Sequence, residues 1–383
     1  MLLLVSLSIV IWFVLLFGRG RFWLADQRLP VAAEPPARWP EVVAIIPARD
    51  EAQTIGAVLA SHAATEYPGH FSVILIDDGS TDGTGEIARG LAATSPRPIH
   101  VLEAPPLPPG WTGKLWALET GATTAASLTP AAGMILLTDA DITHAPDTLT
   151  RLVAHAEGQG LALTSLMARL DARGFWGALL IPAFVFFFQK LYPFPWVNDP
   201  TRGTAGAAGG CILVRREALD AIGGIAAIRG ALIDDCTLAA TIKHGPPRRA
   251  IWLGLAAHEA VSLRDNRALG SVWKMVTRTA FTQLRHSTVL LIGSVLGMAL
   301  IYLAGPLAVL LLPLHGSNLT GSLGAVAWML SGLAYLPTVR LYGFAAWRAL
   351  GLPLAALFYG AMTVASAIAH WRGRGGAWKG RTY

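Results

Sequence analysis

Charged residues are scarce in this sequence. Asp, Glu, Lys and Arg make up 14% of its 383 residues, whereas about 25% is usual for a soluble domain. Hydrophobic residues make up 53%, and the mean hydropathy is +0.49. This composition excludes an ordinary soluble globular chain and indicates membrane segments. The length leaves room for one α/β domain and several spans.

Cysteine is nearly absent as well. Cys211 and Cys236 are the two cysteines, and two such residues give neither a disulfide framework nor a metal-ligand spacing. A disulfide-stapled secreted fold and a cysteine-bound zinc site are therefore excluded. We expect both thiols to be small, buried interior groups.

A nucleic-acid-binding patch is also missing. The net charge of +6 and the pI of about 9.6 would suit such a partner. However, the Lys and Arg residues do not alternate with aromatic residues in one patch. They follow apolar stretches, where positive-inside topology and anionic lipid headgroups explain them better. We therefore expect a lipid bilayer as a partner and no nucleic acid.

The N-terminus lacks the marks of a cleaved signal peptide. Residues 1–17 are apolar without a charge, and Arg19 and Arg21 follow. A signal peptide needs a basic start and a small-x-small cleavage site, and neither is present. We predict an uncleaved membrane anchor over residues 1–23, with the residues after it in the cytoplasm.

The centre of the chain alternates short apolar runs with helical segments. Strands are predicted at residues 42–46, 73–76, 99–102, 134–138, 161–167 and 211–214. Helices are predicted at residues 51–63, 81–93, 114–126, 146–157 and 234–238. This alternation is typical of βαβ units and a parallel sheet, whose ligands bind at the carboxyl ends of the strands. Polar residues stand at those ends: Arg49, Asp50, Asp77, Asp78, Asp139 and Asp141.

The stretch MILLTDAD, residues 134–141, is the clearest of these strand ends. Side chains two apart in an extended segment point to the same side, so Asp139 and Asp141 can present their carboxylates together. Such a pair can bind a divalent cation with substrate phosphates. Each acidic pair, Asp234-Asp235 included, could instead cap a turn or a helix. Three pairs in a chain so poor in charge favour a metal and phosphate site.

The remaining apolar segments predict the membrane part. Residues 174–197 are interrupted by Gln189, Lys190 and prolines, which favours an interfacial or re-entrant segment over a full span. Residues 264–285 predict an amphipathic helix on the inner leaflet. Spans are predicted at 289–312, 323–339 and 352–369, followed by a basic tail. Together with the anchor, three spans would leave that tail outside. The positive charge of the tail favours the cytoplasm. The number of spans after the anchor must then be even, so either one of the apolar stretches is interfacial or residues 174–197 cross the membrane.

These observations divide the chain into predicted parts. They are an anchor at 1–23, a cytoplasmic catalytic domain at 41–262, an amphipathic helix at 263–287, transmembrane helices at 288–370 and a basic tail at 371–383.

Several motifs, taken in order, resemble the GT-A glycosyltransferases of family 2, the inverting group that uses nucleotide sugars. They are PARDEA (47–52), IDDGSTDGT (76–84), GKLWAL (113–118), TDAD (138–141), GGCILVRREAL (209–219) and DDCTL (234–238). The resemblance implies an α/β fold: a mostly parallel sheet with helices on both faces, plus transmembrane helices at both ends. WTGKLWAL, IPAFVFFFQKLYPF, GGIAAIRGALIDDC, RTAFTQLR and the ending WRGRGGAWKGRTY resemble, more narrowly, the hopene-associated glycosyltransferases, relatives of ceramide and carotenoid glycosyltransferases.

The resemblance also implies roles for individual residues. Asp78 would bind the uracil or ribose, and Asp139 and Asp141 would bind Mg²⁺ or Mn²⁺ against the diphosphate. Asp235 would be the general base toward the acceptor hydroxyl. The nucleotide-sugar side would further include Pro47, Arg49, Asp50, Glu51 and Lys114, and the acceptor side Gly209, Gly210 and Asp234.

One motif departs from the family pattern. Many relatives carry Q-x-x-R-W before the membrane helices, and here the stretch is Gln283-Leu-Arg285-His286, without tryptophan. This argues against a processive polymerase, which usually binds its chain with that tryptophan. It leaves open whether Arg278 or Arg285 contacts the diphosphate, or whether both face anionic lipid.

The implied function is transfer of one sugar from a nucleotide sugar, UDP-linked by the resemblance, to a hydroxyl of a membrane isoprenoid lipid in hopanoid metabolism. Transfer to ceramide, diacylglycerol, a carotenoid or polyprenyl phosphate is the alternative within the same chemistry. A non-catalytic membrane scaffold is the alternative outside it, and the complete carboxylate set disfavours it. A transporter is disfavoured because the spans carry few buried charges. The expected location is the inner cell membrane, with the catalytic domain in the cytoplasm.

Overall fold

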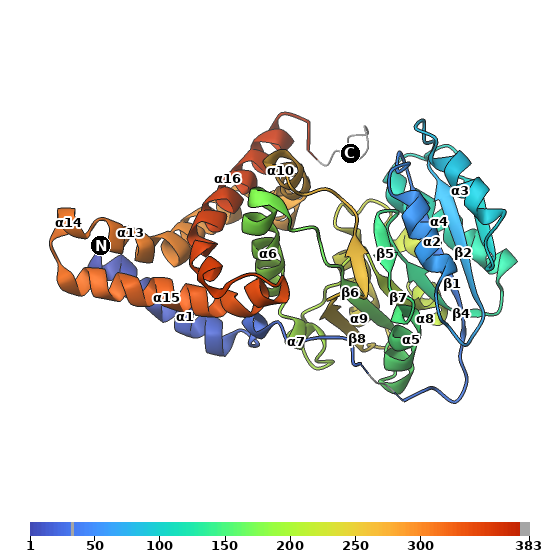
Figure 1. Ribbon diagram of the computed structural model, residues 1–383, viewed down its shortest axis with the longest axis horizontal. Coiled ribbons are helices and arrows are strands. Elements are labelled where there is room, and N and C mark those ends of the chain that lie inside the picture. The colour runs from blue at the N-terminus through green and yellow to red at the C-terminus, as the bar shows by residue number, and fades with distance from the viewer. Residues whose placement is uncertain (32–33, 376–383) are drawn as a thin grey trace. The chain divides into compact units, whose positions relative to one another are not determined.

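The chain divides into two compact units in the computed structural model (Figure 1). The structure describes residues 1–31 and 34–375. Unit 2 comprises Asp26–Leu170 and Trp196–Arg264. Unit 1 comprises Met1–Ala25, Asp171–Pro195 and the residues from Asp265 onward.

Unit 2 is built on a seven-stranded sheet with the strand order β3-β2-β1-β4-β7-β6-β8. Its strands are β1 (Glu41–Ala48), β2 (Phe71–Asp77), β3 (Ile99–Glu103), β4 (Ala132–Leu137), β6 (Leu163–Met167), β7 (Ile212–Arg215) and β8 (Ile251–Leu255). A separate antiparallel pair joins β5 (Ile142–His144) to β9 (Ala260–Ser262). The predicted βαβ order is confirmed for β1 to β4, which pair in parallel.

Strand β7 differs from the prediction of a parallel sheet. It runs antiparallel to both β4 and β6. Parallel neighbours need a crossover on one face of the sheet, and β7 instead enters from a loop and leaves directly into helix α8 (Arg216–Ala221). The sheet is therefore mostly parallel, and β8 and β9, which the periodicity did not predict, complete unit 2.

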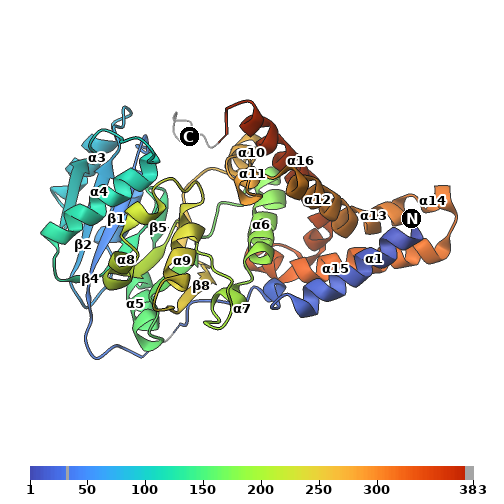
Figure 2. The same cartoon turned by 180° about the vertical axis from the view of Figure 1, so that it is seen from behind.

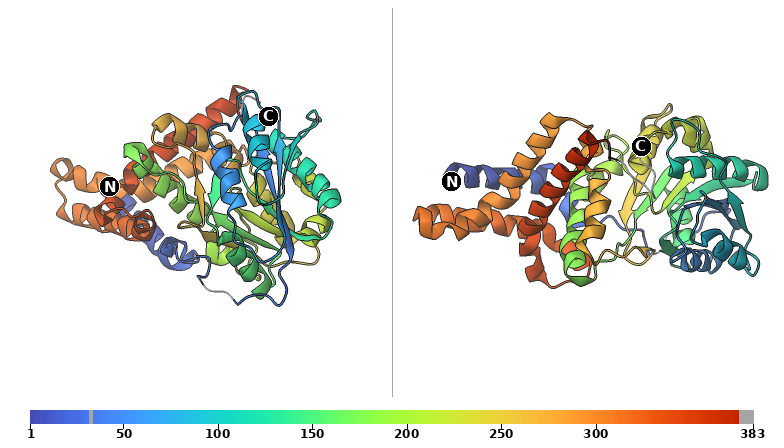
Figure 3. Two further views of the ribbon diagram at one scale, coloured as in Figure 1. Left: turned by 45° about the vertical axis from the view of Figure 1, so that its right-hand side comes forward. Right: turned by 90° about the horizontal axis from the view of Figure 1, so that it is seen from above.

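Helices cover both faces of the sheet (Figure 3). Helices α2 (Ile55–Ala63), α3 (Thr84–Ala92) and α5 (Thr148–Gly158) bury apolar residues in one core cluster with alternate residues of β1, among them Val42, Ala44 and Ile46. Helix α4 (Gly113–Leu128) packs on the other face, where β1 turns Ile45 toward it. This two-sided burial explains why strands β1 and β2 are apolar throughout.

Gly121 lies where α4 approaches the sheet most closely. A Cβ added there would meet Ile45 Cγ2 at 2.3 Å. We expect Gly121→Ala to lower the free energy of unfolding by about 1–3 kcal/mol through overpacking. Thermal unfolding of the purified protein measures the change. Gly90→Ala, in helix α3 with open space around the added Cβ, is the matched control, and it should be neutral or stabilising. Equal destabilisation by both variants would contradict this packing argument.

Unit 1 is helical (Figure 2). Its helices include α1 (Leu2–Gly18), α6 (Gly174–Leu191), α10 (Leu269–Thr277), α11 (Ala280–Gln283), α12 (Thr288–Met298), α13 (Ala304–Leu310), α15 (Asn318–Leu341) and α16 (Leu352–Trp371). Among residues 1–31 and 34–375, four segments are long and apolar enough to cross a membrane, by length and composition: Gly174–Val197, Thr288–Leu310, Asn318–Leu341 and Ala346–Trp371. Helix α1 is apolar but shorter.

Glycines bring α13 and α15 close together. A Cβ on Gly305 would meet the carbonyl oxygen of Gly324 at 2.9 Å, and a Cβ on Gly324 would meet that of Gly305 at 2.8 Å. Small residues at a helix crossing are typical of helix association in membranes, where close backbone contact replaces a hydrophobic driving force. This packing agrees with membrane segments in unit 1.

The predicted amphipathic helix over 264–285 is wrong as one continuous helix. The structure has two shorter helices, α10 and α11, interrupted at Arg278 and Thr279. The Ser366 hydroxyl accepts a hydrogen bond from Phe281 N–H at 3.0 Å and donates to Thr277 O at 2.6 Å. This hydroxyl supplies partners for backbone groups that the break leaves without intrahelical ones. The basic tail from residue 376 onward lies outside the described residues.

Candidate active site

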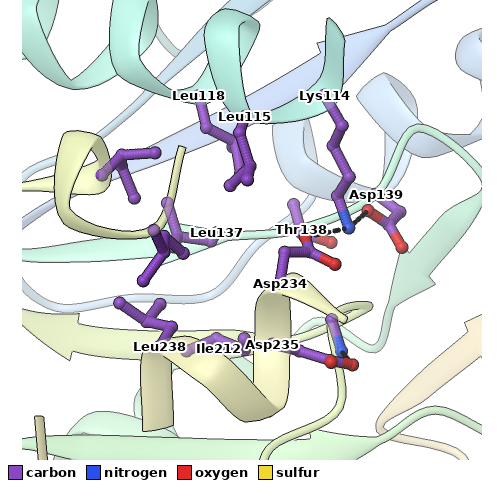
Figure 4. Close-up of a pocket in the computed structure, with 13 residues that line it drawn as sticks. Lys114, Leu115, Leu118, Leu137, Thr138, Asp139, Ile212, Asp234, Asp235 and Leu238 are labelled. Atoms are coloured by element: carbon purple, nitrogen blue, oxygen red, sulfur yellow. Dashed lines mark hydrogen bonds and ion pairs between the residues drawn. The ribbon is translucent and has the colours of Figure 1, made fainter. Parts of the chain in front are cut away.

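Charged and apolar side chains of unit 2 line one cavity (Figure 4). The charged ones are Lys114, Asp139, Asp234 and Asp235. They come from the first turn of α4, the loop after β4 and the first turn of helix α9 (Asp234–His244). The apolar ones include Leu115, Leu118, Leu137, Ile212, Ile225, Ile228 and Leu238. Residues separated by more than a hundred positions therefore meet at one polar corner of an otherwise apolar cavity.

Lys114 links two of the predicted carboxylates. Its Nζ lies 2.9 Å from Asp139 Oδ1 and 2.9 Å from Asp234 Oδ2. A cation in the first turn of a helix is unfavourable by itself. Burial also opposes its charge, but the two carboxylates outweigh burial and hold the pKa of Lys114 above its usual value. Lys114 therefore stays charged between the carboxylates of Asp139 and Asp234.

The surroundings of Asp235 change its pKa. Its Oδ2 accepts a hydrogen bond from Gly209 N–H at 2.9 Å, and its Oδ1 accepts one from Cys236 N–H at 2.7 Å. Burial, reinforced by the neighbouring charge of Asp234, raises the pKa of Asp235 to about 6. A carboxylate with such a pKa can accept a proton near neutral pH more readily than an exposed one.

Asp139 and Asp141 follow β4, as predicted. Burial raises the pKa of Asp139, Lys114 opposes the rise, and the nearby Asp141 carboxylate adds to it. Asp141 Oδ2 also accepts a hydrogen bond from Ser262 Oγ at 2.9 Å. Two carboxylates whose charges disfavour one another are suited to a divalent cation, which would relieve that repulsion.

The structure limits how such a cation could bind. Within residues 1–31 and 34–375, no group of three or more His, Cys, Asp or Glu side chains is arranged to bind a metal ion. The two aspartates fit the mode in which one or two carboxylates bind Mg²⁺ together with substrate phosphates. The remaining ligands would then come from the substrate.

The predicted nucleotide side gathers at the ends of β1 and β2. Ala48 pairs with Asp77, and Asp78 N–H donates to Ala48 O at 2.8 Å. The Arg49 guanidinium donates to Asp78 O and lies 3.5 Å from Asp78 Oδ2. Asp78 is 4% exposed. Pro47 is the last residue but one of β1, so the PARDEA motif forms this edge.

Asp50 and Glu51 form a turn here, not the start of the helix predicted from residue 51. Asp50 has a φ of +50° and accepts a hydrogen bond from Thr81 N–H at 2.9 Å. The Asp50 and Glu51 N–H groups donate to Ser80 Oγ and Thr84 Oγ1. These bonds and the left-handed conformation of Asp50 hold the stretch as a turn, and the helix begins at Ile55.

The glycine pair lies beside the cavity. A Cβ added at Gly209 would meet Lys114 Nζ at 3.2 Å and Asp235 Oδ2 at 3.5 Å, so a side chain there would crowd both. Gly210 O accepts a hydrogen bond from Thr138 Oγ1 at 2.8 Å, and Thr138 also lies 3.0 Å from His144 Nε2. The sequence did not single out Thr138, whose only signal is that it directly precedes Asp139.

Arg278 and Arg285 belong to unit 1. Arg285 has a φ of +52°, and His286 after it has a φ of +54°. Their predicted contact with the diphosphate stays a prediction.

Comparison with known proteins identifies the kind of domain. Residues 43–223 match the family described as "Glycosyl transferase family 2". Mannosyltransferase PcManGT from Pyrobaculum calidifontis, solved in complex with GDP-Man and Mn²⁺, is 21% identical with a TM-score of 0.53, over 96% of this chain and 99% of that one. This likeness shows that the two share a fold.

Two further solved structures are less similar. S. aureus TarS is 16% identical, with a TM-score of 0.42 over 63% of this chain and 39% of that one. Glucosyl-3-phosphoglycerate synthase from Mycobacterium tuberculosis, solved with Mn²⁺, UDP-Glc and phosphoglyceric acid, is 22% identical, with a TM-score of 0.40 over 64% of this chain and 79% of that one. No curated protein matches the chain. The family match and the GT-A fold agree with the broader of the two resemblances in the sequence.

Proposed function

We propose, from the family 2 glycosyltransferase domain that residues 43–223 form, that this protein transfers one sugar from a nucleotide sugar to a hydroxyl of a membrane lipid, with inversion at the anomeric carbon. The observation that carries the proposal is the cluster in Figure 4: Lys114 between Asp139 and Asp234, with Asp235 beside them. In this proposal Lys114 supplies the positive charge, Asp139 binds the metal ion and Asp235 is the base.

Each residue has a role in this reaction. Asp235 takes the proton of the acceptor hydroxyl as the oxygen attacks the anomeric carbon, and Gly209 N–H keeps its carboxylate oriented. Asp234 and Gly210 belong to the same acceptor side. Lys114 supplies positive charge toward the leaving diphosphate, which gains negative charge in the transition state. Arg49 and Asp78, with Pro47, Asp50 and Glu51, bind the nucleoside.

Asp139 and Asp141 fit a divalent cation, Mg²⁺ or Mn²⁺. When bound, the ion stabilises the charge of the diphosphate electrostatically. One of Arg278 and Arg285 is proposed to contact the diphosphate as an additional cation. Which of the two does so is open.

The charge distribution supports a lipid acceptor. Unit 1 contains only two acidic residues, Asp171 and Asp265, against fourteen Lys and Arg residues. Both aspartates are paired locally, Asp171 with Arg173 and Asp265 with Arg267. The other basic residues that the structure describes stand among helices apolar enough to span a bilayer, where anionic headgroups attract them. This agrees with a multi-pass protein of the inner membrane whose catalytic domain faces the cytoplasm.

The finer assignment is UDP as the carrier and an isoprenoid lipid of hopanoid metabolism as the acceptor. It rests on the narrower sequence resemblance. Ceramide, diacylglycerol, carotenoid and polyprenyl phosphate are the other acceptors within this chemistry.

Nucleoside diphosphate release by the purified protein in detergent tests the reaction. UDP-glucose and GDP-mannose should be compared as donors, with and without chelator. Release that is equal with and without chelator would contradict the metal-dependent reaction, and absence of release with every donor and lipid would favour the scaffold alternative. Mass spectrometry of polar lipids from cells with and without the protein identifies the acceptor, and an unchanged hopanoid profile would contradict the narrower assignment.

The pH dependence of turnover should report Asp235. The base acts in its deprotonated form, and its pKa is about 6. Turnover should therefore rise with pH through about 6 and level off above it. Initial rates of diphosphate release from pH 5 to 8, at saturating donor and lipid, measure this limb. A profile that is flat between pH 5 and 7 would argue against Asp235 as the base.

A further inference from the structure

The loop over residues 198–210, here called the acceptor-side loop, runs between two strands of the sheet and passes α9. Its first residue is fastened to β8: Asn198 Oδ1 accepts from Leu253 N–H at 2.7 Å, and Asn198 Nδ2 donates to Leu253 O at 3.1 Å. Its other end is fastened to β6, where Ala208 N–H donates to Ser165 Oγ at 2.9 Å. Between these ends, residues 200–203 are exposed.

Lys243, in the last turn of α9, contacts this loop from inside. Its Nζ donates to four backbone carbonyls: Trp196 O at 3.3 Å, Val197 O at 2.7 Å, Asp199 O at 3.0 Å and Thr204 O at 2.8 Å. We call this arrangement the carbonyl cage. Lys243 is 2% exposed, so these oxygens replace the water shell of a buried ammonium.

A buried lysine so arranged needs an explanation. A buried charge costs free energy unless it is hydrogen-bonded or paired, and an apolar residue could fill the same volume. Burial lowers the pKa of Lys243 to about 8, so the ammonium form still predominates at neutral pH. The Asp199 carboxylate favours its charge and Arg248 opposes it. Unlike an apolar side chain, the ammonium can bind carbonyls at residues 196–199 and at Thr204 at the same time.

The geometry points to Lys243 as a positioning residue for the acceptor side: its ammonium binds the acceptor-side loop to the same helix that carries Asp235 at its other end. Contacts at successive positions join that helix to the part of the loop that leads to Gly209. Lys243 binds Thr204 O, Cys236 Sγ lies 3.4 Å from Ala207 O, and Asp235 Oδ2 accepts from Gly209 N–H. The assignment of this loop to the acceptor rests on the proposed function, whereas the contacts themselves do not.

The consequence concerns Gly209. If the cage is lost, the segment from Thr204 to Ala208 keeps its contact with Ser165 at Ala208 but loses its contact at Thr204, so the Gly209 N–H that orients Asp235 is held less firmly. Small displacements of a positioned group can cost up to about 100-fold in rate. Arg49 and Asp78 lie at the ends of β1 and β2, which β4 and β7 separate from the strands that the loop contacts, so donor binding should not change.

Lys243→Ala tests the inference in the full-length protein in detergent. We expect kcat/KM for the lipid acceptor to fall roughly 10- to 100-fold, with the KM for the nucleotide sugar unchanged. We also expect faster hydrogen–deuterium exchange of the amides in residues 199–208. His244→Ala is the matched control, since His244 Nε2 lies 2.9 Å from Gly203 O in the same loop but is exposed. It should change neither quantity more than about twofold.

Rescue by a small amine separates a positioning role from a general loss of stability. Lys243→Ala removes three carbons and the ammonium group, and propylammonium has the same size. Added propylammonium should therefore slow hydrogen–deuterium exchange in residues 199–208 again and restore much of the kcat/KM for the acceptor. Tetramethylammonium at equal ionic strength cannot donate hydrogen bonds and should not. If Lys243→Ala does not fold, as judged by thermal unfolding, Lys243→Gln, which keeps two N–H donors, should fold and show a smaller change in the same direction.

The outcomes are distinguishable. Unchanged exchange in residues 199–208 in a folded Lys243→Ala protein would overturn the inference. So would faster exchange accompanied by equal losses for donor and acceptor, because that pattern is a merely structural effect. Failure of the wild-type protein to release nucleoside diphosphate would instead overturn the proposed function, and the exchange measurements would still decide whether the cage fastens the loop.

Discussion

Replacing Asp235 with Asn is expected to lower kcat about 10³-fold, because the isosteric amide cannot take the acceptor proton. Nucleotide-sugar binding should remain, since the donor-side residues are untouched. The variant should also fold. The pKa of Asp235 is raised in the folded protein, so its carboxylate contributes less stability at pH 7 than at pH 4, and a neutral side chain removes that cost. The amide can accept only one of the two hydrogen bonds that Asp235 accepts from Gly209 and Cys236 N–H, which offsets part of this gain. Diphosphate release and calorimetric titration with the nucleotide sugar measure the two effects.

Asp220→Asn is the matched control for this change. Asp220 is an exposed carboxylate of α8, and its backbone rather than its side chain makes the contacts that the structure describes. It should retain the full rate. Turnover of Asp235→Asn within tenfold of the wild type, or loss of donor binding in parallel with the rate, would assign Asp235 to binding and not to proton transfer.

Replacing Lys114 with Met should move two quantities in opposite directions. Turnover should fall by roughly 100-fold, because the leaving diphosphate loses a fixed positive charge. Affinity for Mn²⁺ in the absence of nucleotide should rise, because Asp139 and Asp234 each lose an ammonium at 2.9 Å. With the ammonium present, the cation must compete with Lys114 for Asp139. Titration of Mn²⁺ followed by electron paramagnetic resonance measures this affinity apart from any activity.

The opposite signs make this prediction specific. A variant that was only damaged would lose turnover and metal affinity together. Lys274→Met removes an exposed lysine of unit 1 and should leave the Mn²⁺ affinity unchanged. Weaker Mn²⁺ binding by Lys114→Met would contradict the view that Lys114 and the metal ion share Asp139.

The sequence predicted the strand ends well, because burial on both faces makes a run such as that of β4 apolar without interruption. Asp78 and Asp139 therefore fell at the correct edge. The pairing of Lys114 with Asp234 was beyond reach, because 120 positions separate the two residues and no periodicity connects them. Strand β8 was missed for a related reason: the run IWLGL carries a glycine, and its place beside β6 depends on the whole sheet.

The role of Lys243 could not be predicted from the sequence either. In the sequence it is one lysine near the end of a helix, where a basic residue is common and favourable. Its partners are backbone carbonyls, which every residue type carries, so the sequence does not reveal them. The break between α10 and α11 was equally hidden, since the hydroxyl that serves it belongs to Ser366, in a different helix.

The division of the chain into alternating stretches bears on the order in which the protein is made. Strand β7 lies between β4 and β6, yet α6 separates it from both in the chain. During translation the sheet therefore lacks the strand between β4 and β6 until residues 212–215 are made. The apolar helix at 174–191 is made before that strand. A fragment that ends at residue 170 lacks the central strand and should not fold. A version reduced to unit 2 would have to remove residues 1–25, replace 171–195 by a short connection and end at residue 264.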